Sequence, residues 1–333
     1  MRQTLTGEMK EMKTRILTIF MVLAFCMSKL TFAQIPDAQT SENTLKTSVD
    51  LGVLIFTSDS TLNVYGEEKI EDNRNRAEHS ASTWALPLVD LRYVLSGTMT
   101  QFFLGTPIEG SDIALALGVV QPLPEIGIIT VSVAPTLGAE VWENPYETGV
   151  ARSKSPVDVF TSKFKVDRLA FTPLNLEYTN RTIDVKNDEI GELEPDLKQD
   201  GRTDTLQITY DFGLSETSLL SPGISFEQGN FEGEANSYDQ KMFSLSYKSL
   251  NGDLVFMVEG KAGSALFGKE HPLYEKTRRD DSAGAFALLR IQNLFDVENL
   301  HSNIILGGGV VNSNIDFFDN NTYFTALTLG YEY

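Results

Sequence analysis

The sequence predicts an all-β protein, a transmembrane antiparallel β-barrel of about 14 strands, with about 12 as the alternative count. Three observations predict this fold. The N-terminal segment is typical of an exported protein, apolar residues recur at every second position from residue 44 onward, and the connections alternate between long and short. A period of two gives each strand one apolar face and one polar face, as a wall between lipid and a lumen requires.

Residues 1–33 have the features of a secretory signal peptide. A basic start precedes an apolar run from Ile16 to Met27, and Ala33 offers a small residue for cleavage. The run is shorter than the roughly 20 residues that a spanning helix needs, so a membrane anchor is the less favoured alternative. We therefore expect three segments along the chain: a signal peptide at 1–33, a short periplasmic lead-in at 34–43 and an outer-membrane barrel at 44–333.

The composition argues against several other classes of protein. The only cysteine, Cys26, lies in the apolar run, so a chain beginning at Gln34 has neither a disulfide nor a thiolate metal site. That chain contains 22 Lys+Arg and 44 Asp+Glu, a formal net charge of −22. Because nucleic-acid binding depends on clustered basic residues, we expect no nucleic-acid partner. With 41% hydrophobic and 10% aromatic residues, the chain is too apolar to be disordered.

Strand-like alternation runs from residue 44 to the end. In the first strand Leu51 and Val53 share a face, and in the last strand Leu327 and Leu329 share a face with the terminal Tyr333. A terminal aromatic residue resembles the ending of bacterial outer-membrane barrels, which the insertion machinery reads, so we expect that machinery as a partner. The expected strands cover residues 45–55, 84–95, 100–105, 113–120, 127–137, 157–166, 172–185, 204–212, 220–228, 238–248, 254–261, 283–294, 302–312 and 323–333.

The connections between these strands alternate in length. The longer, polar ones fall at 56–83, 106–112, 138–156, 186–203, 229–237, 262–282 and 313–322. The short turns fall at 96–99, 121–126, 167–171, 213–219, 249–253 and 295–301. Long outer loops alternating with short periplasmic turns are typical of outer-membrane barrels, whereas a soluble β-sandwich, the alternative, has no reason to keep its long loops on one side.

In each expected strand, the residues that alternate with the apolar ones point to the other face of the wall. The charged residues at these positions are therefore expected to line the lumen. These candidates are Asp50, Asp90, Arg92, Lys163, Lys165, Glu177, Arg181, Asp211, Glu227, Lys248, Glu259, Lys261 and Arg290, together with Glu332. Acidic and basic side chains are balanced in this set. Such a set either forms ion-pair networks or lines a wet channel, and the sequence leaves both possibilities open.

Most of the surplus negative charge falls in the expected loops. These carboxylates either bind Mg²⁺ or Ca²⁺ shared with lipopolysaccharide phosphates or form a solvated surface, and their spacing matches no dedicated calcium loop. We expect no resident metal and no cofactor. The expected partners are outer-membrane lipid and lipopolysaccharide. A 262–282 loop that folds inward would form an anion-selective constriction with its basic residues Lys269, Lys276, Arg278 and Arg279.

The histidines argue against an enzyme. His79 and His271 fall in expected loops and His301 falls in an expected turn at the opposite end, so we expect no His to share a site with an acid–base partner. Gly307 to Gly309 lie within a strand, without the strand–loop–helix setting of a phosphate-binding loop. We therefore predict no enzymatic activity.

Several loop motifs together resemble a known family. They are Glu143–Val150, Asp184–Gly191, His271–Arg278 and Ser313–Asp319. The sequence is similar over most of its length, from about Ile35 to Tyr333, to a Gram-negative family of outer-membrane barrels catalogued as domain of unknown function 2860. This resemblance implies the barrel fold and an integral outer-membrane location, and it carries no activity or site residues.

Two functions remain for such a chain. The first is a porin-like passive channel for small polar solutes, because a barrel of about 14 strands has room for a channel. The second is a non-conducting structural or interaction barrel that binds lipopolysaccharide or a partner through its acidic loops.

Overall fold

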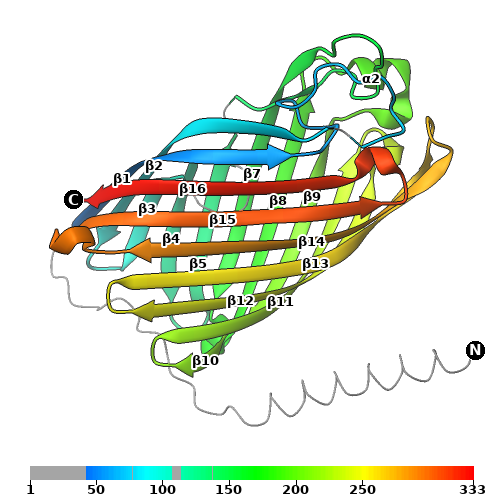
Figure 1. Ribbon diagram of the computed structural model, residues 1–333. Helices are drawn as coiled ribbons and strands as arrows, with labels where there is room; N and C mark the ends of the chain where they lie inside the picture. The colour runs from blue at the N-terminus through cyan, green and yellow to red at the C-terminus, as the bar shows by residue number, and fades with distance from the viewer. Residues whose placement is uncertain (1–42, 77, 107–113, 137) are drawn as a thin grey trace, which may run out of the picture.

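One antiparallel sheet closes on itself to form the wall of the protein (Figure 1). The computed structural model describes residues 43–76, 78–106, 114–136 and 138–333. The predicted signal peptide and all of the predicted lead-in except Asn43 lie outside these residues and stay predictions.

Fourteen strands make the wall, which confirms the predicted fold and strand number. The strands are β1 Thr44–Ser58, β2 Ser80–Leu95, β3 Thr100–Gly105, β4 Ala116–Leu123, β5 Gly127–Pro135, β6 Glu140–Trp142, β7 Lys154–Asp167, β8 Leu174–Val185, β9 Gly201–Tyr210, β10 Phe212–Ser215, β11 Ser218–Phe231, β12 Tyr238–Asn251, β13 Leu254–His271, β14 Lys276–Ile291, β15 Leu300–Ser313 and β16 Asn320–Glu332. Of these sixteen, β6 lies off the barrel and pairs only with β7. β9 and β10 follow one another along β11, separated by Asp211, and count as one wall strand.

The first and last strands close the barrel. β1 pairs with β16 from Ser48 opposite Glu332 to Ser58 opposite Thr322. Closure leaves no free sheet edge, so every wall strand has a hydrogen-bonded neighbour on both sides, as a lipid environment demands.

Side chains alternate between the two faces of the wall as the period of two predicts. Leu51 and Leu329 lie opposite each other and are 67% and 51% exposed, whereas the neighbouring Asp50 and Leu54 face inward and are buried. The outer face of the barrel is therefore apolar, which suits contact with lipid tails.

The two ends of the barrel differ. At the turn end, where β1 begins and β16 ends, the strands are joined by connections at 96–99, 124–126, 168–173, 216–217, 252–253 and 292–299. At the loop end the described connections are 59–79, 136–153, 186–200, 232–237, 272–275 and 314–319, except for residues 77 and 137. The predicted loop at 106–112 lies, apart from Thr106, outside the described residues. Figure 1 shows α2 and the long loops gathered at one end and the C terminus at the other.

The helices among the described residues are all short. They are the α-helix α2 Glu189–Leu193 and the 3₁₀ turns η1 Leu169–Phe171, η2 Pro195–Leu197, η3 Glu234–Asn236, η4 Leu294–Asp296 and η5 Asp316–Phe318. Within the described ranges, no helix has the length and apolar character needed to cross a membrane.

The prediction of a loop at 262–282 is wrong. β13 and β14 continue through this region as a paired ribbon, and only residues 272–275 connect them. The segment is rich in polar residues because a strand that extends beyond the lipid needs no apolar outer face. The expected inward-folded constriction therefore does not form from a loop, and Arg279 points outward beside Asp281.

Candidate functional site: the barrel lumen

The charged residues predicted for the lumen share the inward face of the wall. Residues that lie opposite each other in neighbouring strands point to the same face of the sheet. Asp50 on β1 lies opposite Leu88 on β2, and Lys165 on β7 lies opposite Glu177 on β8. By the same pairing, the side chains of the other predicted lumen residues in the strands, and that of Glu332, also point inward. Asp211, in the gap between β9 and β10, joins them through its contacts with Asn175 and Ser221.

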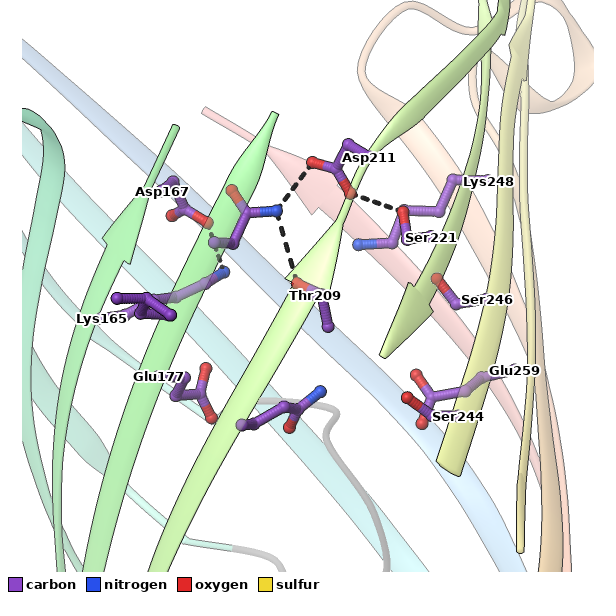
Figure 2. A pocket seen from close by; sticks show the side chains of 13 residues that line it. Lys165, Asp167, Glu177, Thr209, Asp211, Ser221, Ser244, Ser246, Lys248 and Glu259 are labelled. Carbon is purple, nitrogen blue, oxygen red and sulfur yellow. Dashed lines mark hydrogen bonds and ion pairs between the residues drawn. The ribbon is translucent and has the colours of Figure 1, made fainter. Parts of the chain in front are cut away.

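Five of these residues line a polar cavity near the turn end, which we call the inner compartment (Figure 2). Its volume is about 160 Å³. Its charged lining consists of Lys165, Asp167, Glu177, Asp211, Lys248 and Glu259. Most of the other lining groups are hydroxyls and amides, so the walls offer both donors and acceptors to a solute.

Some of the charges in the inner compartment are already engaged. Lys165 Nζ lies 3.1 Å from Asp167 Oδ1, and Asp211 accepts hydrogen bonds from Asn175 at 2.9 Å and from Ser221 at 2.5 Å. In the part of the chain that the structure describes, Lys248 and Glu259 have no side-chain hydrogen bond or ion pair. One cation and one carboxylate therefore face the inner compartment without a partner among the described residues.

Other predicted lumen residues form ion pairs along the wall. Lys163 Nζ lies 3.2 Å from Glu177 Oε1, Arg92 pairs with Asp90 at 2.7 Å, and Arg290 pairs with Glu332. Glu227 accepts hydrogen bonds from Tyr238 and Thr205 at 2.6 and 2.7 Å. The structure thus contains the ion pairs that the sequence left open as one possibility, beside lumen charges that have no partner among the described residues.

Asp50 is the centre of a buried polar cluster where the barrel closes. Its Oδ1 lies 2.7 Å from His301 Nε2 and accepts a hydrogen bond from Asn303 Nδ2 at 2.9 Å, and Thr328 Oγ1 lies 3.4 Å away. All four side chains are buried. Gly330 provides the space, because a Cβ there would overlap the Asp50 carboxylate and the His301 ring. The cluster therefore ties β1 to β15 and β16 across the closing seam.

This cluster corrects the prediction for His301. His301 lies in β15 rather than in a turn. Its acidic partner is Asp50, whereas no histidine was expected to share a site with an acid–base partner. The two residues are separated by 251 positions, so sequence spacing gave no signal. Ser48 Oγ donates to the other Asp50 oxygen, and His301 Nδ1 has no partner in the described residues, so no hydroxyl sits where the imidazole would activate it.

The wall across the lumen from the inner compartment is apolar on its inner side. Inward-facing side chains of β1, β2, β15 and β16 pack together here, with help from β14; they are Leu54, Leu86, Leu88, Ile305 and Ala326. This explains why the sequence of β15 is apolar on both faces. The predicted lumen, derived from charged residues alone, missed this patch.

At the loop end, six of the seven loops pack into one structure, which we call the cap. Its apolar core consists of Ile70, Tyr146, Ile190, Leu197, Ala235, Ile315, Phe317 and Phe318, with Tyr274 packed against it. Phe317 is fully buried between the rings of Tyr146 and Phe318, at centroid distances of 5.0 and 5.1 Å. Loops that are far apart in the sequence are thereby fixed to one another.

A buried arginine joins the first and third loops of the cap. The Arg152 guanidinium donates to the backbone carbonyls of Thr61 and Pro145, each at 2.9 Å, and to that of Glu67 at 2.5 Å. It also stacks on the Trp142 ring at 4.2 Å. Burial lowers the pKa of Arg152 to about 10, so the group stays charged at neutral pH.

His271 fixes the aromatic part of the cap. Its Nδ1 accepts from the Leu273 N–H at 3.3 Å, so the ring proton lies on Nε2 and is donated to the Tyr146 hydroxyl at 3.1 Å. Burial raises the pKa of the Tyr146 and Tyr274 phenols above their usual value. The Tyr274 hydroxyl donates to the Asn73 carbonyl at 2.7 Å, which adds a tie to the first loop.

On the outside of the cap, acidic side chains are paired with lysines. Lys198 contacts Asp200 and Glu232, and Lys269 contacts Asp196 and Glu234. These pairs connect the fourth and fifth loops to β13. In the described ranges, no three His, Cys, Asp or Glu residues lie in a group that could hold a metal ion.

A closed 14-strand barrel with an apolar outer face, a charged inner face and long loops at one end is an outer-membrane β-barrel. The chain belongs to the family described as protein of unknown function (DUF2860), which matches residues 45–332.

Solved outer-membrane proteins resemble the chain at low identity. OmpT of Vibrio cholerae is 9% identical with a TM-score of 0.43, over 90% of this chain and 100% of that one. The outer membrane channel DcaP of Acinetobacter baumannii is 8% identical with a TM-score of 0.43, over 91% and 100%. OpdQ of Pseudomonas aeruginosa is 10% identical with a TM-score of 0.35, over 87% and 97%. No curated protein matches the sequence. These similarities are too low to transfer a residue or an activity.

Proposed function

We propose that the protein is a passive channel for small polar solutes whose outer entrance is restricted by the cap. The observation that carries this proposal is the inner compartment. Lys248 and Glu259 face a cavity there without a partner among the described residues. A charged side chain facing a dry interior would be costly, so these two groups imply water in the lumen.

The cap determines how solutes enter. Its residues Tyr146, Leu197 and Phe318 lie over inward-facing wall residues at the loop end. A packed apolar core holds the loops in one arrangement, and so the outer entrance is narrower than the barrel. We therefore expect small conductance steps rather than those of a wide open pore.

Single-channel recording tests the proposal. The chain from Gln34 to Tyr333 is refolded, inserted into a planar lipid bilayer, and recorded in potassium chloride. Discrete conductance steps are expected from the folded barrel, and a heat-unfolded sample serves as the blank. A folded, inserted barrel that gives no steps above the blank would remove the channel proposal.

A second candidate function is an interaction barrel that binds lipopolysaccharide or a partner through its cap. The rigid packing of six loops favours it, because a defined outer surface suits recognition. It predicts that lipopolysaccharide binds the refolded protein and that disruption of the fourth loop, 186–200, abolishes this binding. In this case the permeability of liposomes carrying the protein would equal that of empty liposomes.

A further inference from the structure

We infer that a second cavity, beneath the cap, is a binding site for a small neutral aromatic molecule bearing one hydrogen-bonding group. We call this cavity the outer compartment. Binding of such a molecule does not require that the barrel conducts.

The outer compartment lies between the cap and the inward face of the wall. Its volume is about 400 Å³, within the usual range for small-molecule sites of roughly 300–1,000 Å³. The cap contributes Tyr146, Leu197 and Phe318, and the wall contributes residues from β8 and β11 to β14. The cavity is therefore formed by parts of the chain that only the folded barrel brings together.

Aromatic and aliphatic side chains dominate the lining. Five rings face the cavity, and they belong to Tyr146, Phe231, Tyr238, Phe267 and Phe318. Ring faces and edges at several orientations favour offset or edge-to-face contact with another flat ring. The lining thus favours contact with a flat aromatic ligand.

Among the described residues that line the cavity, one ion pair is present, and its two charges offset each other. Arg278 donates to both carboxylate oxygens of Asp280 at 2.6 to 3.0 Å, and its guanidinium is held between the rings of Phe318 and Phe267 at 3.7 and 4.4 Å. A charged ligand would have to compete with one member of this pair. The compartment therefore favours a neutral ligand.

Gln240 provides the polar contact. It lies on β12, opposite Glu227 on β11 and Ala265 on β13, and its side chain lines the cavity. Among the described residues, its amide has no hydrogen-bond partner. The other lining amides are engaged, since Gln199 donates to Trp142 and Asp188, and Asn236 donates to Leu197 and Lys198. A ligand amide or hydroxyl would satisfy Gln240.

The test measures benzamide binding to the refolded protein in lipid nanodiscs by ligand-observed NMR, with empty nanodiscs as the blank. Benzamide should bind saturably. Ala265→Phe, which fills the cavity from β13, should weaken binding at least about tenfold. Gln240→Leu should weaken benzamide binding about fivefold, the value of one hydrogen bond, and leave toluene binding within about twofold.

Ala262→Phe is the matched control, because Ala262 lies on the same strand with its side chain on the lipid face. It should bind benzamide like the parent protein. Absence of saturable binding to the parent, or equal binding by the Ala265→Phe and Ala262→Phe proteins with both barrels intact, would overturn the inference. A conducting protein that fails to bind benzamide would contradict only this site, whereas a binding protein that fails to conduct would contradict only the channel.

Discussion

The core of the cap and the closing seam of the barrel are held by different kinds of contact. At the loop end, the cap is a core of aromatic and aliphatic side chains from six loops, centred on Phe317. At the turn end, the closing seam is fixed by a buried polar cluster centred on Asp50, next to a lumen lined by charge. Apolar packing is non-directional and can yield locally, whereas a buried hydrogen-bonded cluster depends on exact partners. We therefore expect the loop end to open without unfolding the barrel, and the turn end to keep the barrel closed.

The largest expected effect comes from Asp50→Ala. The change leaves His301, Asn303 and Thr328 buried without their shared acceptor. Because each unsatisfied buried group costs about 1–3 kcal/mol, the free energy of unfolding should fall by about 5 kcal/mol. Urea unfolding in lipid, followed by the gel mobility of unboiled samples, measures it.

Asp90→Ala is the control for this prediction. Asp90 pairs with Arg92 on the same wall, but both side chains are more than 40% exposed. Its loss should cost less than about 1 kcal/mol, as for other exposed ion pairs. Similar losses for the two variants would show that the Asp50 cluster has no special part in closure.

A smaller and local effect is expected from Phe317→Ala. Removing this ring from the cap core should destabilise the cap by about 3–4 kcal/mol and leave the wall closed. Limited proteolysis should then cut the loops faster, while the unboiled gel mobility stays that of the parent. Channel conductance should also rise.

Phe295→Ala is the matched variant at the other end. Phe295 lies in a turn and is 83% exposed, so its loss should change neither loop cleavage nor conductance. If the Phe317→Ala protein instead unfolds as a whole, the cap and the barrel form a single cooperative unit. That result would contradict the expectation that the loop end opens while the barrel stays folded.

The strands of the wall were predictable from the sequence because the alternation of apolar and polar residues is a local pattern within each strand. Alternation along one strand, as in Leu327 and Leu329, decides which face meets lipid, and no distant residue changes that result. The extent of β13 was not predictable, because this pattern fails once a strand leaves the lipid and its outer face becomes polar.

The parts that depend on distant contacts were also missed. His301 meets Asp50 only because β1 and β16 close the sheet, and Tyr146 meets Phe317 only because loops from separate hairpins converge at the loop end. Neither contact leaves a periodic pattern. The predicted list of lumen residues was built from charges, so it omitted Gln240, a neutral group whose position opposite Glu227 follows from the register alone.

We propose that water fills the inside of this barrel and that lipid surrounds it. A chain beginning at Gln34 has no cysteine, so single cysteines report cleanly. Ser244 lines the inner compartment, and the next residue, Leu245, lies on the outer face of the same strand. In liposomes, a charged, water-soluble thiol reagent should modify the Ser244→Cys protein and spare the Leu245→Cys protein. Modification of Leu245→Cys with protection of Ser244→Cys, or equal modification of both, would contradict the account.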